Sequence, residues 1–363
     1  MAVITQAHEQ WATRPEDERF TSLDKLVEFT SKQKKNSFEA IANPSTFEIV
    51  EAEGQLLLGG SGDSTGDPVA LNAWSFGQLA YMAEAPVGYL NKLPAPIVRD
   101  ALNHGLSQRD NDVGLLIRDG VDTSELAAVT GPKYGRIWND DVARALRDKF
   151  GNGLDGDFTI PGEFGRKVPI TKANTTLYAG DRDMFVFLAD ETNRIELPNR
   201  RNGETGSLAR GFFVWNSEVG SRSLGIATFM FDYVCSNRIV WGAEGFEQII
   251  INHTSSAPEK FLSELEPQLH EYAQREASSI RYAIEHARGH QLDEEGVDVF
   301  LRKLLTKKDV EAVKAVHFAE EDRPIESLWD ASVGVTAYAK QIPNQDNRMW
   351  YERLGGKIIE MAQ

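Results

Sequence analysis

The sequence is short of cysteine and of long apolar runs. Cys235 is the only cysteine among 363 residues, which excludes an internal disulfide and a cysteine-based metal cluster within one chain. No apolar run approaches the roughly 20 residues that a helix needs to cross a bilayer. The N-terminal stretch also lacks the basic segment and apolar core of a secretory signal. We therefore expect a protein that has no membrane partner and stays in the cytoplasm.

The sequence also lacks the motifs that mark common active sites. Its most loop-like stretch, residues 59–68, has neither the lysine nor the spacing of a phosphate-binding loop. It contains no His-x-x-x-His pair for a metal and no nucleophile elbow for hydrolysis. We therefore predict no cofactor, no metal ion and no catalytic residue.

Basic residues are outnumbered by acidic ones. The chain has 39 Lys and Arg against 55 Asp and Glu, so its formal net charge is −16. Residues 160–240 hold ten basic and nine acidic side chains, a net charge of +1, which leaves −17 for the rest of the chain. Long-range repulsion from the acidic parts opposes approach to nucleic acid or anionic lipid. The middle is the only long part of the chain that is not strongly acidic.

The stretch from Arg210 to Gly242 gathers aromatic residues, the cysteine and several polar residues. Three apolar runs, at 212–215, 224–231 and 239–241, are separated by polar segments rich in Gly, Asn and Ser. β-Branched and aromatic residues favour strands, and the separating residues favour turns. The stretch therefore predicts three strands joined by two turns. Because the runs are apolar at consecutive positions, both faces of these strands are expected to be covered.

The chain is long enough for more than one core, because single cores stop growing at about 250–300 residues. Strand and hairpin patterns alternate with helix patterns up to about residue 255, and helical periodicity dominates afterwards. We predict an α+β fold with a central, mostly antiparallel sheet over residues 113–253. The expected parts are a mixed N-terminal region (1–110) with a hairpin and helices, a central β-rich domain (111–255) and a helical C-terminal domain (256–363).

The chain resembles the phage/plasmid-like protein family, a domain of unknown function carried by phages, prophages and plasmids. The residues that carry the resemblance are Tyr134 with its following helix, Asn216-Ser217-Glu218 with Gly220, Asp232 to Asn237, His253-Thr254, Trp329 and Val335 to Tyr338. The resemblance implies an origin in a bacteriophage or another mobile element and expression in a bacterial cytoplasm. It implies no activity and no catalytic residues.

Single-stranded nucleic acid is the first ligand class that the central stretch suggests. Aromatic strands beside arginines can stack bases and bind phosphate without sequence preference. This hypothesis predicts a non-enzymatic DNA-metabolism factor, active in annealing or recombination, that forms a homo-oligomer. The predicted contact residues are Arg166, Lys167, Arg200, Arg201, Arg210, Arg222 and Arg238 for phosphate, Trp215 or Trp241 for stacking, and Asn216, Ser217 and Asn237 at the turns.

Two other classes of function remain as alternatives. The acidic exterior could bind a host protein, as a host-takeover or anti-defence factor does. Alternatively, Glu218, Asp232, His253 and Cys235 could share a pocket in which a metal ion promotes phosphodiester cleavage. The spacing of these four residues matches no known metal motif.

Overall fold

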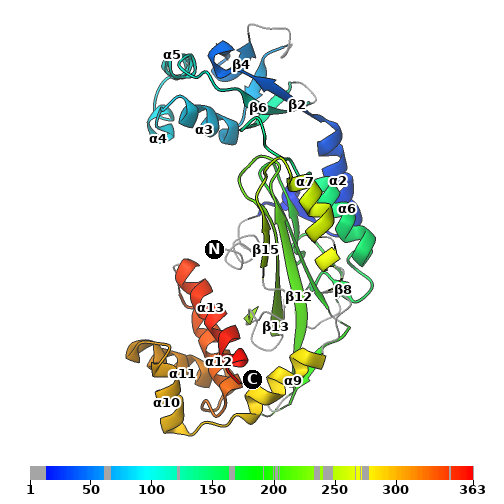
Figure 1. Ribbon diagram of the computed structural model, residues 1–363, viewed down its shortest axis with the longest axis vertical. Helices are drawn as coiled ribbons and strands as arrows, with labels where there is room; N and C mark the ends of the chain where they lie inside the picture. The colour runs from blue at the N-terminus through cyan, green and yellow to red at the C-terminus, as the bar shows by residue number, and fades with distance from the viewer. Residues whose placement is uncertain are drawn as a thin grey trace.

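The computed structural model of the chain describes residues 14–60, 67–120, 123–162, 168–190, 192–198, 200, 203, 205–232, 238–239, 248–265, 267–269, 271, 278–342 and 345–362. Figure 1 shows an elongated molecule in which three parts follow one another along the long axis: an N-terminal sheet with helices, a central sheet with helices, and a group of C-terminal helices. The α+β prediction is confirmed, including a helical C-terminal region. No helix in the described ranges is long and apolar enough to cross a membrane.

The N-terminal part contains a six-stranded sheet in the order β2-β6-β7-β5-β4-β3. All pairs are antiparallel except the parallel pair of β5 and β7. Helices α3, α4 and α5 pack on this sheet, and the Asn72 side chain caps α3 by accepting from the backbone N–H groups of Trp74 and Ser75. The elements are β2 (Ser37–Ala42), β3 (Phe47–Ala52), β4 (Gln55–Gly60), β5 (Val69–Leu71), α3 (Ala73–Met82), α4 (Val87–Leu90), α5 (Ala95–Leu106), β6 (Val113–Arg118) and β7 (Glu125–Thr130).

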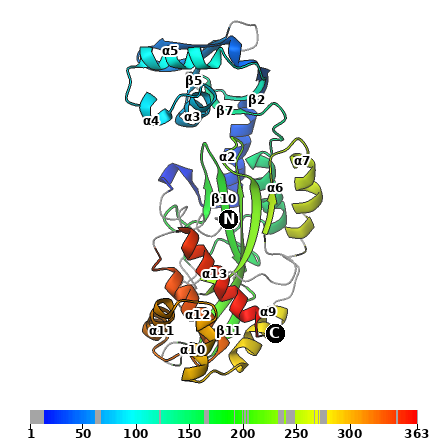
Figure 2. The same ribbon diagram turned by 60° about the vertical axis from the view of Figure 1, so that its left-hand side comes forward.

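The central part is a second, antiparallel sheet. Its main order is β1-β9-β10-β12-β13-β14, and β8, β11 and β15 pair at the sides of this path. Figures 1 and 2 show α2, α6 and α7 along one side of it. The elements are β1 (Arg19–Phe20), α2 (Leu23–Lys35), α6 (Asn139–Phe150), β8 (Phe158–Thr159), β9 (Leu177–Ala179), β10 (Met184–Asp190), β11 (Ile195–Leu197), β12 (Gly206–Asn216), β13 (Leu224–Asp232), β14 (Arg238–Ile239), β15 (Gln248–Ile251) and α7 (Ala257–Lys260).

Both faces of the central strands are buried, as their consecutive apolar residues predict. Phe212 and Val214 of β12 join the core beneath α2 and α6. Phe213 and Trp215 point to the opposite face, where they form a separate aromatic cluster with Phe185. The rings of Phe185 and Phe213 stack with centroids 5.5 Å apart.

The C-terminal part is a group of helices with its own core around the fully buried Trp329. Side-chain caps at Asp293, Thr306 and Ser327 begin three of its helices. The helices are α9 (Ser278–Gly289), α10 (Glu294–Arg302), α11 (Lys307–Glu321), α12 (Leu328–Ala339) and α13 (Gln345–Glu360).

The structure divides the strands differently from the single sheet predicted over residues 113–253. β6 and β7 belong to the N-terminal sheet, and the central sheet instead takes in β1 from near the start of the chain. The predicted hairpin of β3 and β4 is confirmed. Residue patterns reveal that a segment is a strand, but its partner depends on packing between distant segments.

A buried histidine in the C-terminal part is expected to make stability depend on pH. His317 of α11 is fully buried, its Nδ1 lies 3.1 Å from the carbonyl oxygen of Arg323, and burial lowers its pKa below 6.5 despite nearby Asp330. Below pH 6.5 the unfolded chain takes up this proton and the folded chain does not, so stability falls with falling pH by up to about 1.4 kcal/mol per pH unit.

The measurement is chemical denaturation of the native chain and His317→Gln between pH 7 and pH 5. The stability advantage of the native chain over the variant should shrink as the pH falls. His290→Gln, at an exposed position, is the control and should leave the pH dependence unchanged. If the free energy of unfolding of the native chain exceeded that of His317→Gln by the same amount at pH 7 and pH 5, the expected role of His317 would be wrong.

Candidate functional site

Four residues predicted to contact nucleic acid lie inside the molecule. Arg210 is 4% exposed, and its Nη2 donates to Oδ2 of the buried Asp190 at 2.6 Å. Trp215 is 3% exposed and packs over Gly225 of β13, where an added Cβ would come within 2.0 Å of the indole ring. Asn216 and Ser217 are also buried. Their burial corrects the predicted contacts with nucleic acid: phosphate binding by Arg210, stacking by Trp215, and contacts at the turn by Asn216 and Ser217.

Arg200 is likewise an internal residue. Its Nε lies 3.0 and 3.1 Å from the two carboxylate oxygens of Glu321, and both side chains are only 1% exposed. The guanidinium group also lies over the ring of Trp329, 5.9 Å from its centroid. Arg200 thus connects the loop before β12 with the end of α11. Because it is buried, the prediction that it is an exposed phosphate contact is wrong.

The remaining predicted contacts are only partly described. Arg222 is half-buried and its Nε donates to Asp183 at 2.6 Å. Arg238 lies in β14, where the structure describes the backbone alone, and five of the predicted residues lie outside the described residues: Arg166, Lys167, Arg201, Asn237 and Trp241. The members that the structure does describe form no exposed basic surface.

The polar turn after β12, residues 216–221, is the joint between the N-terminal and central parts. Glu218 is 1% exposed; its carboxylate accepts from Arg118 Nη2 at 2.9 Å and from the backbone N–H of Asn139 at 2.7 Å. Arg136 donates to the backbone oxygen of Glu218. Burial raises the pKa of Glu218, and the nearby Arg118 opposes this effect. These partners come from β6 (Arg118), from the segment before α6 (Arg136) and from the first residue of α6 (Asn139), so the turn holds separate elements together.

Two further residues of the family resemblance meet at the same joint. The Tyr134 hydroxyl donates to the backbone oxygen of Ser217 at 3.0 Å. Its ring stacks on His253, with centroids 4.8 Å apart, and Nδ1 of His253 lies 3.0 Å from the carbonyl oxygen of Gly135. Burial lowers the pKa of His253. A set of residues far apart in sequence therefore builds one packed contact.

The metal-site alternative gains no geometric support. The oxygens of Glu218 are occupied by Arg118 and Asn139, and no cluster of three or more His, Cys, Asp or Glu suited to a metal lies within the described ranges. The side chains of Asp232 and Cys235 are outside the described part, so their distance from Glu218 is not defined.

The 216–221 turn contacts residues that line an open groove beside α3. The backbone oxygen of Val219 accepts from Trp74 Nε1 at 2.9 Å and from Gln78 Nε2 at 3.3 Å. The Gln78 Oε1 atom accepts in turn from the backbone N–H of Val129 at 2.8 Å. These bonds fix α3 relative to the 216–221 turn and to β7.

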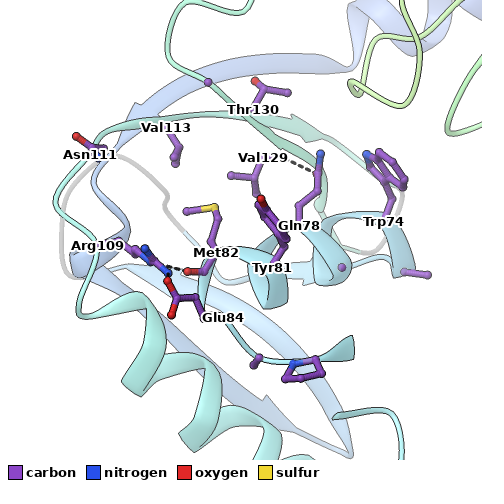
Figure 3. Close-up of a pocket in the computed structure, with 15 residues that line it drawn as sticks. Trp74, Gln78, Tyr81, Met82, Glu84, Arg109, Asn111, Val113, Val129 and Thr130 are labelled. Carbon is purple, nitrogen blue, oxygen red and sulfur yellow. Dashed lines mark hydrogen bonds and ion pairs between the residues drawn. The ribbon is translucent and has the colours of Figure 1, made fainter. Parts of the chain in front are cut away.

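Between α3 and the strands runs a groove of about 1130 Å³, which we call the α3 groove. Figure 3 shows Tyr81 and Met82 of α3 facing Val113 and Val129 of the strands. Its lining is mainly apolar, and Tyr81 is 84% exposed. The lining residues are Ala73, Trp74, Gly77, Gln78, Tyr81, Met82, Glu84, Ala85, Pro86, Arg109, Asn111, Val113, Val129, Thr130 and Gly131.

Charged groups stand at the ends of the α3 groove. At one end Arg109 Nη2 pairs with Glu84 at 2.6 Å, and the Glu84 side chain is 78% exposed. At the other end the guanidinium of the exposed Arg182 stacks over Trp74, 5.5 Å from the ring centroid. The groove therefore has an apolar floor, with the Glu84–Arg109 ion pair at one end and Arg182 over Trp74 at the other.

Gly77 is an unusual residue for its position. It lies in the interior of α3, where glycine costs about 1 kcal/mol relative to alanine. A Cβ at Gly77 would meet no heavy atom within 4 Å beyond the local helix backbone, so no neighbour in the described structure requires glycine there. The missing side chain instead keeps the floor of the α3 groove low.

Sequence reasoning missed this groove. The apolar stripe of Leu71, Trp74, Leu79 and Met82 predicts a helix, and α3 confirms it. The available signal was the row of Ala73, Gly77 and Tyr81, which recur every four residues and so lie on one face of the helix. That row puts small residues next to an aromatic one, but it does not show by itself that another molecule lies against it.

Comparison with known proteins gives one finding. A family model described as "Domain of unknown function (DUF932)" matches residues 167–351, a range that holds the 216–221 turn and Arg182 but not α3. No curated protein and no solved structure matches the chain. Because the match covers more than half of the 363 residues, the chain belongs to the DUF932 family, whose domain has no known function.

Proposed function

We propose that this protein is a non-enzymatic binding protein that holds an apolar segment of a partner protein in the α3 groove. The observation that carries the proposal is the groove itself: its lining is mainly apolar, Gly77 adds no side chain to its floor, and Tyr81 is 84% exposed beside it. Tyrosine, tryptophan, methionine and arginine are enriched in protein interfaces, and Trp74, Met82 and Arg109 also line the groove.

The charged residues around the α3 groove indicate which charges a bound segment should carry. The chain carries a formal net charge of −16, and exposed Asp110 and Asp112 flank Asn111 at the end of the groove that holds Glu84. Complementary charges guide encounter and set orientation. A fitting segment therefore has an apolar face, a basic end over Glu84 and an acidic end over Arg182.

Single-stranded nucleic acid is a second candidate ligand. It is favoured by the stacking of Arg182 on Trp74 and by the exposed ring of Tyr81, since bases stack on such groups. It ranks second because nucleic acid binding needs a cationic track, whereas the cation that lines the groove, Arg109, is paired with Glu84. The resemblance alone supports two further proposals: that phages or plasmids carry the gene, and that the protein acts in a bacterial cytoplasm.

A photocrosslinking experiment separates the two ligands. Tyr81 of the full chain is replaced by p-benzoylphenylalanine and the chain is irradiated in bacterial cells, with the same replacement at Tyr282 as control, because Tyr282 is also an exposed helical tyrosine but lies on α9. We expect a crosslinked product at position 81 that resists nuclease, disappears with protease and is absent at position 282. A product that disappears with nuclease would favour nucleic acid, and equal products at both positions would contradict a site in the α3 groove.

A further inference from the structure

The two edges of the N-terminal sheet differ in how they are protected. β3 forms one edge and β2 the other. On β3, the Asn103 side chain of α5 accepts from the backbone N–H of Ile49 at 2.7 Å and donates to its backbone oxygen at 2.9 Å. One amide thus occupies both backbone groups of Ile49, so an added strand cannot pair there.

β2 has no such protection. It pairs with β6 on one side, and no other described strand lies against it. Strand edges are usually blocked by proline, bulges or inward charges. β2 contains none of these, its one charged residue is Glu39, and Phe38 and Ile41 are 41% and 58% exposed.

The hydrogen bonding of β2 shows which backbone groups are free. The backbone N–H of Asp119 donates to the oxygen of Asn36, and the register continues with Ser37 opposite Arg118. Bonded pairs alternate along an antiparallel ladder, so even-numbered residues of β2 bond towards β6. The N–H and C=O groups of Ser37, Glu39 and Ile41 therefore point outwards.

We infer that β2 pairs with β2 of a second copy of this chain, antiparallel and across a two-fold axis, to join two six-stranded sheets into one. The strand is self-complementary, and this pairing does not depend on the ligand in the α3 groove.

The two-fold axis leaves few possible registers. Residues that face each other across an antiparallel pair lie on the same side of the sheet, so their numbers add to an even total. Centring on Glu39 would set two carboxylates opposite each other, which is destabilising. Centring on Ala40 sets Glu39 opposite Ile41 of the second copy and Phe38 opposite Ala42. In this register the outward backbone N–H and C=O groups of Glu39 in one copy can also form hydrogen bonds with those of Ile41 in the other.

In this register, a cysteine at Ala40 can test the pairing of the two β2 strands directly. Ala40 then faces Ala40 of the second copy in a non-hydrogen-bonded pair with Cα atoms about 4.5 Å apart, within disulfide range. Ala40→Cys should form a covalent dimer on mild oxidation. Ile97→Cys is the control, because Ile97 is 52% exposed on α5, away from β2. The unmodified chain shows the background from its single cysteine.

Analytical ultracentrifugation of the full chain supplies the second measurement. We expect a species of twice 40.4 kDa whose dissociation constant rises at least about tenfold in Ile41→Glu, since this sets a second carboxylate opposite Glu39 of the second copy, and is unchanged in Ile97→Glu. A chain that stays monomeric at its highest soluble concentration would overturn the inference. So would a dimer in which Ala40→Cys crosslinks no better than Ile97→Cys, or an Ala40→Cys adduct to a different protein.

Discussion

Replacing Glu218 by alanine should lower the free energy of unfolding by about 3–5 kcal/mol, because the change leaves buried charge without its partner. The carboxylate accepts from Arg118 at 2.9 Å and from the backbone N–H of Asn139 at 2.7 Å, and the Arg118 side chain is itself only 11% exposed. Urea denaturation followed by circular dichroism measures the loss. The same change should loosen the joint between the N-terminal and central parts, and thus expose amides of the 216–221 turn to hydrogen exchange.

A matched control sharpens this test. Asp298→Ala removes a carboxylate that is 41% exposed and pairs with Lys314, itself 35% exposed, so it should cost less than about 1 kcal/mol. A loss for Glu218→Ala no larger than that for Asp298→Ala would contradict the role of the joint.

Replacing Glu321 by alanine should cost a similar amount, about 3–5 kcal/mol, for the same physical reason. Glu321 is the last residue of α11, where the helix dipole disfavours a negative charge, and Arg200 compensates it. Without the carboxylate, a guanidinium group with 1% of its side chain exposed loses the two oxygens that lie 3.0 and 3.1 Å from its Nε. Thermal and urea unfolding both report the loss.

The double variant Arg200→Met, Glu321→Leu tests whether the loss of stability comes from breaking the buried ion pair. Replacing both members of a buried ion pair by apolar groups of similar size is often neutral or stabilising. We therefore expect the double variant to be more stable than Glu321→Ala alone, with a coupling energy of about 3 kcal/mol in the complete cycle. A double variant as unstable as the sum of the two single variants would show that the charges do not act as a pair.

Residue types and their order predicted much of the local structure. Consecutive apolar residues such as Phe212 and Phe213 predicted strands covered on both faces, and the two sides of β12 indeed join separate cores. The helical C-terminal region followed from its periodicity. These features depend on near neighbours in the chain, so a single sequence contains them.

The candidate contacts could not be predicted in the same way. Polar residues such as Arg200 and Glu218 were expected at the surface, because burial of a polar group is costly without a partner. Their partners lie 121 residues away at Glu321 and 100 residues away at Arg118, and no local pattern reveals such pairs. The α3 groove was missed for a related reason: a low floor at Gly77 has meaning only beside strands that come later in the chain.

The most direct test of the account measures the affinity of the crosslinked partner after purification. Titration calorimetry compares the native chain with Gly77→Leu, which fills the floor of the groove, and with Gly289→Leu, which adds the same side chain at a helix end elsewhere. Leucine has a higher helix propensity than glycine, so Gly77→Leu should unfold at the same temperature as the native chain or at a higher one. We expect it to weaken binding at least about tenfold, or about 1.4 kcal/mol, while Gly289→Leu binds as the native chain does. Equal dissociation constants for all three chains would contradict binding in the α3 groove.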